Sequence, residues 1–91
     1  MPAKTFTANA STNQLTCTGH GCVTGGPSVI LYAVDASVLP APLAEGTEYA
    51  PIVIDANTLK LAPIAAYAVN QLAIDLTTAG SGTLVLVKVP G

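Results

Sequence analysis

Short runs of apolar and β-branched residues alternate along the chain with breaks rich in glycine and proline. Eight glycines and seven prolines divide the 91 residues so closely that almost no segment has room for a long helix. Residues 14–18 alternate with period two, and residues 28–34 form a continuous apolar run that is typical of a strand covered on both faces. The pattern therefore predicts a chain built mainly of short strands.

The middle of the chain predicts a hairpin. Residues 48–55 and 58–61 are expected to pair around a tight turn at residues 55–57, because Asp and Asn bond their own backbone and tolerate positive φ. Pro51 cannot donate to a ladder of hydrogen bonds, so we expect an edge or a bulge at that position.

The last third of the chain combines one helical segment with further strands. The Ala-rich segment 63–71, with a proline near its start, predicts one short helix of about two turns. Residues 73–76 and 82–89 are expected to be strands. Five to seven short strands with closely spaced turns favour a single all-β domain over residues 1–91, either a small β-sandwich or a partly open barrel.

Charged side chains are scarce. They make up 9% of the chain against about 25% in an average soluble domain, while 51% of the residues are apolar. Three basic residues cannot neutralise the roughly 6–10 phosphates that a duplex-DNA binder contacts, so no nucleic-acid partner is expected. No apolar run approaches the roughly 20 residues that span a bilayer, so no membrane is expected either.

The apolar surplus points to an assembly. So many apolar residues cannot all be buried in a body of this size, and an exposed apolar patch usually marks an interface. The alternative is a small, Thr-rich, weakly charged secreted domain. Residues 1–9 carry one positive charge and no apolar core, so they are not a signal peptide, and we expect synthesis from this initiator Met in a cytoplasm.

Three residues of metal-binding types lie within the segment Cys17–Cys22. A structural zinc site normally takes four ligands from two separated pairs, and the sequence has no other His or Cys, so no metal is expected. Two interpretations of the cysteines stay open. Cys17 and Cys22 either form a disulfide, which requires Cα atoms within about 7 Å, or pack as two buried thiols. A catalytic Cys–His pair is disfavoured, because nothing in the sequence orients His20.

The other polar residues form no catalytic pattern. The five acidic residues are scattered and contain no calcium-loop motif. The glycine-rich segments 19–21 and 24–27 lack the spacing of phosphate-binding loops, and no helix follows them. We therefore expect no enzyme, no catalytic residue and no cofactor.

Five segments in a fixed order carry a family resemblance. They are residues 9–16, residues 19–25 with His-Gly before Thr-Gly, residues 39–49 with Leu-Pro before Gly-Thr-Glu-Tyr, residues 57–62, and residues 73–83 with Asp-Leu-Thr before Gly-Ser-Gly-Thr. From about residue 6 to residue 87 this order resembles a small all-β module of tailed-bacteriophage virion proteins. Cys17 and Cys22 stand where that module usually has aliphatic residues, which supports core packing, and Gly26 stands where it more often has Asp.

The resemblance implies a structural role and assigns no catalytic, cofactor or metal residues. We expect a capsid decoration (cement) protein that stabilises the shell in the virion. Its expected partners are the major capsid protein and copies of itself. A trimer is the oligomer that we consider for the copies of this chain. A tail or tail-fibre module that binds the host is the alternative.

Two segments are the candidate contact surface. Residues 1–8 are a candidate N-terminal arm that could add a strand to a neighbour, and residues 39–43 form an extended loop. The candidate contact residues in these two segments are Phe6, Leu39, Pro40, Pro42 and Leu43. The competing interpretation is that the loop covers the chain's own core.

Overall fold

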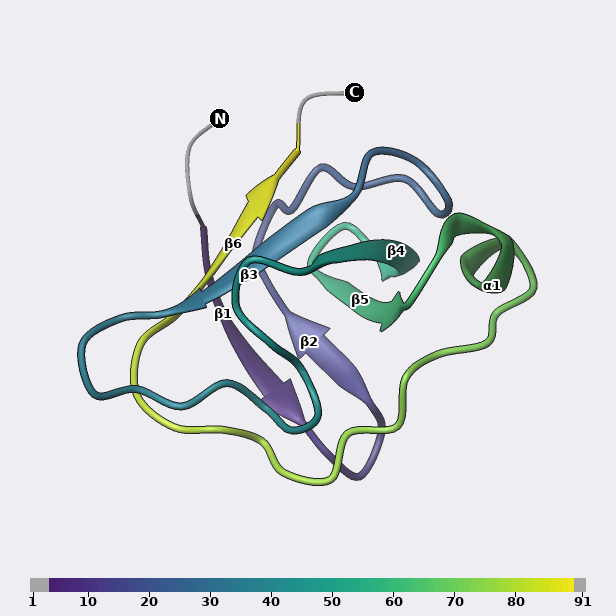
Figure 1. The fold of residues 1–91 in the computed structure, drawn as a ribbon. Coiled ribbons are helices and arrows are strands. Elements are labelled where there is room, and N and C mark those ends of the chain that lie inside the picture. The colour runs from purple at the N-terminus through teal and green to yellow at the C-terminus, as the bar shows by residue number, and fades with distance from the viewer. Residues whose placement is uncertain (1–3, 90–91) are drawn as a thin grey trace.

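Six strands close into one antiparallel barrel in the computed structural model, which describes residues 4–89 (Figure 1). The elements are β1 (Lys4–Asn9), β2 (Gln14–Thr16), β3 (Val29–Ala33), β4 (Glu48–Asp55), β5 (Thr58–Ala62), α1 (Ala65–Val69) and β6 (Leu84–Lys88). The all-β prediction, with a short helix near residues 63–71, is confirmed. The sequence left a choice between a small β-sandwich and a partly open barrel, and the structure shows a closed barrel.

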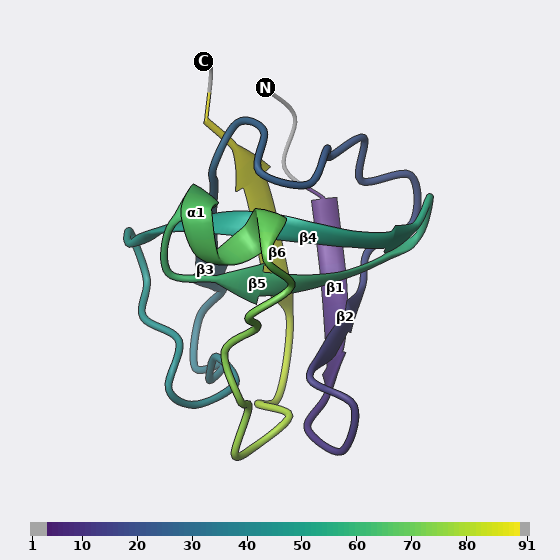
Figure 2. The same ribbon diagram turned by 90° about the vertical axis from the view of Figure 1, so that its right-hand side faces the viewer.

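The strands follow the order β1-β2-β5-β4-β3-β6, and β6 returns to pair with β1. Consecutive strands β3, β4 and β5 are neighbours, and β6 lies beside β3, which is a Greek-key arrangement (Figures 1 and 2). Each strand has a neighbour on both sides, so closure removes the free edges that an open sheet offers to other chains.

The core lies inside the barrel and follows the period-two alternation of the strands. Leu59 and Leu61 of β5 and Leu84 and Leu86 of β6 are buried in this one cluster. In β3 the residues at alternate positions also point inward, but Tyr32 between them is exposed. The continuous apolar run of residues 28–34 is therefore covered fully on one face only, in contrast to the sequence expectation.

A second, smaller layer covers the outside of β4 and β5. Helix α1 packs across these two strands (Figure 2), and the buried side chains between them are those of Ala50, Ile52, Ala62 and Ala68. The three alanines let the helix backbone approach the sheet closely. The helix is shorter than the predicted two turns, because Asn70 and Gln71 leave helical geometry and Gln71 takes a positive φ of 61°.

Pro51 stands in β4 without disrupting its pairing with β5. The Pro51 carbonyl oxygen accepts the N–H of Gly25 at 3.1 Å. In a β-strand the backbone N and O of the same residue point to the same side of the strand. The missing N–H therefore faces the turn at residues 23–26. Thr24 Oγ1 in that turn accepts the N–H of Val53 at 2.8 Å. The turn thus covers a stretch of β4 that β3 does not reach, and the bulge lies between Val53 and Asp55.

Two local predictions are wrong. Residues 4–8, expected as an arm, belong to β1, which pairs with β2 and β6; residues 1–3 lie outside the described residues. Residues 73–76, expected as a strand, make single hydrogen bonds and no ladder: Ile74 N–H donates to Leu61 O at 2.7 Å, and Leu76 N–H donates to Asn13 Oδ1 at 2.9 Å. Asn13 thereby ties the β1–β2 turn to this segment.

Candidate functional site

Four of the five candidate contact residues are buried in the chain's own core. Phe6, Leu39 and Leu43 belong to the main core cluster, and the side chain of Pro40 is also fully buried. Only Pro42 is exposed among the five. The loop after β3 therefore closes one end of the barrel. This agrees with the competing interpretation of the sequence, in which residues 39–43 cover the chain's own core. These four residues are therefore not an exposed contact surface.

Backbone hydrogen bonds hold this loop in place. Val38 and Ser81 exchange two N–H···O bonds, both at 2.9 Å. Ala41 O accepts the N–H of Thr77 at 2.9 Å, and Ala41 N–H donates to Thr78 Oγ1 at 3.0 Å. The loop is thus fixed to residues 77–81 on the far side of the barrel mouth.

His20 is buried, with 2% of its surface exposed, and both ring nitrogens have partners. Nδ1 accepts the N–H of Cys22 at 2.9 Å, which requires a neutral ring with its proton on Nε2. Nε2 then donates to the Asp55 carbonyl oxygen at 2.7 Å. The neighbouring Gly19 N–H donates to Asn57 Oδ1 at 2.9 Å. These bonds fasten the His20 loop to the β4–β5 turn and engage both ring nitrogens.

Cys17 and Cys22 are free thiols buried in the core. Burial raises the pKa of both thiols above their ordinary value, although the ammonium groups of Lys4 and Lys88 act in the opposite direction. A buried thiol with a raised pKa is a poor nucleophile and a poor metal ligand. The two sulfur atoms are not bonded in this structure, and a thiol titration tests whether the predicted Cys17–Cys22 disulfide forms in the protein.

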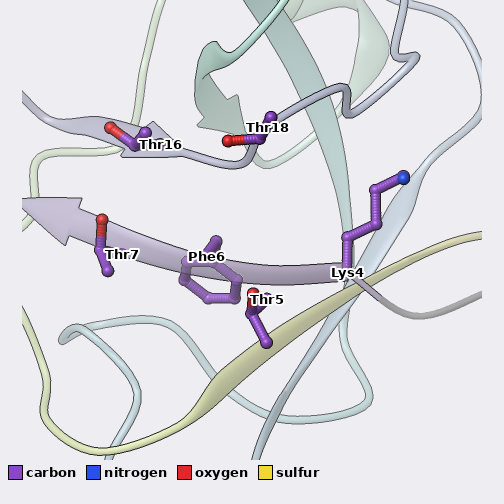
Figure 3. A pocket seen from close by; sticks show the side chains of 6 residues that line it. All are labelled: Lys4, Thr5, Phe6, Thr7, Thr16 and Thr18. Atoms are coloured by element: carbon purple, nitrogen blue, oxygen red, sulfur yellow. The ribbon is translucent and has the colours of Figure 1, made fainter.

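Threonine side chains dominate the groove between β1 and β2. The groove between β1 and β2 has a volume of about 300 Å³ and opens because the two strands pair only from Thr7 onward (Figure 3). Its lining residues are Lys4, Thr5, Phe6, Thr7, Thr16 and Thr18, without an acidic or imidazole group. Within residues 4–89, no three His, Cys, Asp or Glu side chains lie close enough together to hold a metal ion.

None of the helices in the part of the chain that the structure describes is long and apolar enough to span a bilayer.

Large apolar side chains are exposed around α1. We define the α1 surface by five of them: Val23, Ile64, Tyr67, Val69 and Leu72. Tyr67 is 47% exposed and Val69 is 61% exposed. Val69 lies against the turn that carries Val23, because a Cβ added at Gly25 would come within 2.8 Å of Val69 Cγ1. The helix and the turn therefore form one continuous surface.

This surface is unusual for a helix on a small barrel. From Pro63 to Val69 the Tyr67 hydroxyl is the one polar side-chain group, and all seven residues except Ala68 are exposed. A surface helix normally presents charged and polar residues to water. Sequence reasoning located the helix but missed its exposure. The signal was present, since a helix this short and apolar all round cannot be buried on every side.

A second group of exposed apolar side chains lies at the opposite side of the barrel, at the end of β3 and in the turn after it (Figure 1). We define the β3 surface by Tyr32, Val34 and Val38. Two carboxylates flank it: Asp35 and Glu45 line the same groove of about 330 Å³ as Val38. Glu45 Oε1 accepts the N–H of Ala33 at 2.7 Å, which places its charge beside β3.

The two surfaces differ in charge. Residues 61–74 and 5–34, which supply all of the α1 surface, contain no Asp, Glu, Lys or Arg. The β3 surface is apolar with an acidic border. The segments of the α1 surface are thus uncharged, with Lys60 of β5 and Glu48 of β4 at the border, whereas the border of the β3 surface is acidic.

Comparison of the chain with known protein families, curated proteins and solved structures finds no match.

Proposed function

We propose that this protein is a non-enzymatic structural component of a bacteriophage virion, and within that class a capsid decoration protein that stabilises the shell. The observation that carries the proposal is the pair of exposed apolar surfaces on opposite sides of the barrel. A subunit between two neighbours needs two such surfaces. The phage class itself rests on the order of sequence segments between residues 6 and 87.

The polar residues support a role without catalysis. Both nitrogens of His20 are engaged in fixed hydrogen bonds, and Cys17 and Cys22 are buried with raised pKa. The Asp55 carboxylate accepts the N–H of Asn57 at 2.8 Å within its own turn. The groups that could carry out chemistry therefore serve the fold, and what remains for the surface is binding.

The size of the surfaces suits a contact made in many copies. The five side chains of the α1 surface are about half exposed, so covering each adds about 1 kcal/mol and all of them about 5 kcal/mol. Losing free motion on association costs about as much or more. A single contact is therefore weak, and stable binding arises when many subunits are held on one shell. The major capsid protein and other copies of this chain are the partners that this mechanism requires.

The test uses particles that lack this protein because its gene has been deleted. Purified protein is added, and binding is measured by co-sedimentation and the release of DNA on heating. We expect saturable binding and release at a higher temperature. A Tyr32→Lys variant, which adds a positive charge to the β3 surface but stays folded, should bind less. Particles that neither bind the protein nor gain heat resistance would contradict the proposal.

A tail or tail-fibre module is the second candidate. It is favoured by the exposure of Tyr32 and Tyr67, since exposed aromatic rings can stack on sugars of a host surface. Tyr32 belongs to the end of β3 and Tyr67 to α1, and these two segments lie on opposite sides of the barrel (Figure 1), which is a poor arrangement for one sugar site. Co-sedimentation with tail fractions but not with DNA-filled heads would favour this candidate over decoration.

A further inference from the structure

We propose that the α1 surface binds the α1 surface of a second copy of this chain around a two-fold axis, so that the unit that assembles is a dimer. The inference deepens the proposed function and rests on it in one respect, that the α1 surface is covered in an assembly. The neighbour that covers the α1 surface is then a second copy of this chain. The inference also replaces the trimer considered from the family resemblance with a two-fold unit.

Charge identifies the occupant. In a two-fold contact each surface meets itself, so every charge near the axis faces a like charge. The segments that form the α1 surface carry no charged side chain, so none of its five side chains brings a like charge to a self-contact. The charges at its border are Lys60 of β5 and Glu48 of β4, which lie two residues from Ala62 and Ala50 on the sheet face that α1 covers, and they are of opposite sign. The β3 surface, with Asp35 and Glu45 at its border, would repel a second copy of itself and attract a basic partner. The acidic side is thus left for a different protein.

The side chains of α1 also suit a contact between two helices. Ala65 and Ala66 are exposed, and such small residues allow two helix backbones to approach closely. Tyr67 beside them is a large side chain with little conformational entropy to lose, which is the kind of residue that dominates binding at interfaces. The Tyr67 hydroxyl is the one polar side-chain group between Pro63 and Val69 that has to be desolvated or hydrogen-bonded when the surface is covered.

The area is at the lower end of what a specific dimer uses. Five half-exposed side chains of this size offer roughly 400–500 Å² per copy. The exposed alanines and Pro63 add to this, so two copies bury about 1,000 Å² together, which is the threshold for a specific contact. We therefore expect a reversible dimer that forms with rising concentration, and because its own side chains are uncharged, its formation should depend only weakly on salt.

The experiment is sedimentation equilibrium of the full chain from about 10 μM to about 1 mM, at low and high salt. Two lysine variants form a matched pair, because both residues are tyrosines of similar exposure, 47% for Tyr67 and 42% for Tyr32. Tyr67→Lys should weaken the dimer at least about tenfold, and Tyr32→Lys should change it less than about twofold. Circular dichroism confirms that each variant is folded.

A pair of charged variants at Ala66 tests the two-fold axis directly. Ala66→Lys alone and Ala66→Glu alone should each be more monomeric than the natural chain, because like charges meet across the axis. An equimolar mixture of the two should associate more than either variant by itself, because opposite charges then meet. A heterologous contact between different surfaces would not gain from mixing.

Several results would overturn the inference. These are a monomer at every concentration, equal weakening by Tyr67→Lys and Tyr32→Lys, or a mixture of Ala66 variants that associates no better than its components. If the chain is monomeric and Tyr67→Lys abolishes binding to shells, the α1 surface binds the shell protein, and the proposed function stands while this inference falls. Binding of the monomer to phosphatidylcholine vesicles through Tyr67 would likewise exclude a second copy as occupant.

Discussion

Replacing Gly80 with alanine tests the anchor that holds the loop after β3 on the barrel. Gly80 has a φ of +70°, and a Cβ built there would overlap the Val38 carbonyl oxygen. It would also come within 2.8 Å of Pro40 N and 2.9 Å of Leu39 C. All three atoms belong to the backbone, so no change of rotamer relieves the overlap and the loop itself has to move.

The magnitude follows from three contributions. The left-handed conformation costs an alanine about 1–2 kcal/mol. Displacing packed backbone costs about 1–3 kcal/mol more. The loss of freedom in the unfolded chain returns about 0.4–1 kcal/mol. The net loss is about 3 kcal/mol, out of a total stability of about 5–14 kcal/mol for a chain of this length.

Gly46→Ala is the matched control. Gly46 has nearly the same φ of +73°, but no atom lies within 4 Å of a Cβ built there. This variant carries only the conformational cost, about 1 kcal/mol after the gain in the unfolded state. The two variants should therefore differ by about 2 kcal/mol, or about 8–16 °C in Tm.

The assay is urea and thermal unfolding followed by circular dichroism on the natural chain and both variants. The expected order of stability is natural chain, Gly46→Ala, then Gly80→Ala. If the two variants agree within about 0.5 kcal/mol, residues 38–40 do not lie against Gly80. Leu39 and Leu43 would then not be held in the core as described.

Three further predictions concern the polar groups. In the native protein Cys17 and Cys22 should react with a thiol reagent near neutral pH many times more slowly than after unfolding, because they are buried and their pKa is raised. A titration of the unfolded protein without reductant counts the free thiols. Two free thiols would exclude the disulfide, and no free thiol would show that the cysteines are bonded. The Asn57 N–H that Asp55 accepts lowers the pKa of that carboxyl below its usual value near 3.8. Its stabilisation is therefore present above that value and lost as the pH falls through the lower folded value. Asp55→Asn should flatten the dependence of the urea midpoint on pH below about 5, and an unchanged dependence would contradict this. His20→Ala leaves Cys22 N–H and Asp55 O without their partner and should destabilise the fold by about 2–4 kcal/mol in urea titrations; a loss below about 0.5 kcal/mol would mean that these bonds do not form.

The strands that the sequence predicts most clearly are those in which apolar side chains alternate with side chains that point out of the core. Leu84 and Leu86 mark β6, and Leu59 and Leu61 mark β5, because period two and burial coincide there. Strand β1 was missed, since Phe6 is its only large apolar residue and its place depends on pairing with β2 and β6. Such pairing joins residues as far as 82 positions apart, from Lys4 to Leu86, and leaves no local pattern.

The candidate contact residues failed for a related reason. Leu39 and Leu43 in a proline-rich loop satisfy the pattern of an exposed docking loop and that of a loop folded over a core equally well. Which one occurs depends on distant partners such as Ser81 and Gly80. The α1 surface could have been found, because no residue between 61 and 74 is charged, but exposure depends on how α1 lies on β4 and β5.

Cryo-electron microscopy of a particle that contains this protein tests the central claim most directly. We expect density for the barrel on the outer shell, with Tyr67 buried against another copy and the β3 surface turned toward the shell protein. Density on the tail alone, or a barrel on the shell whose α1 and β3 surfaces both face solvent, would contradict it.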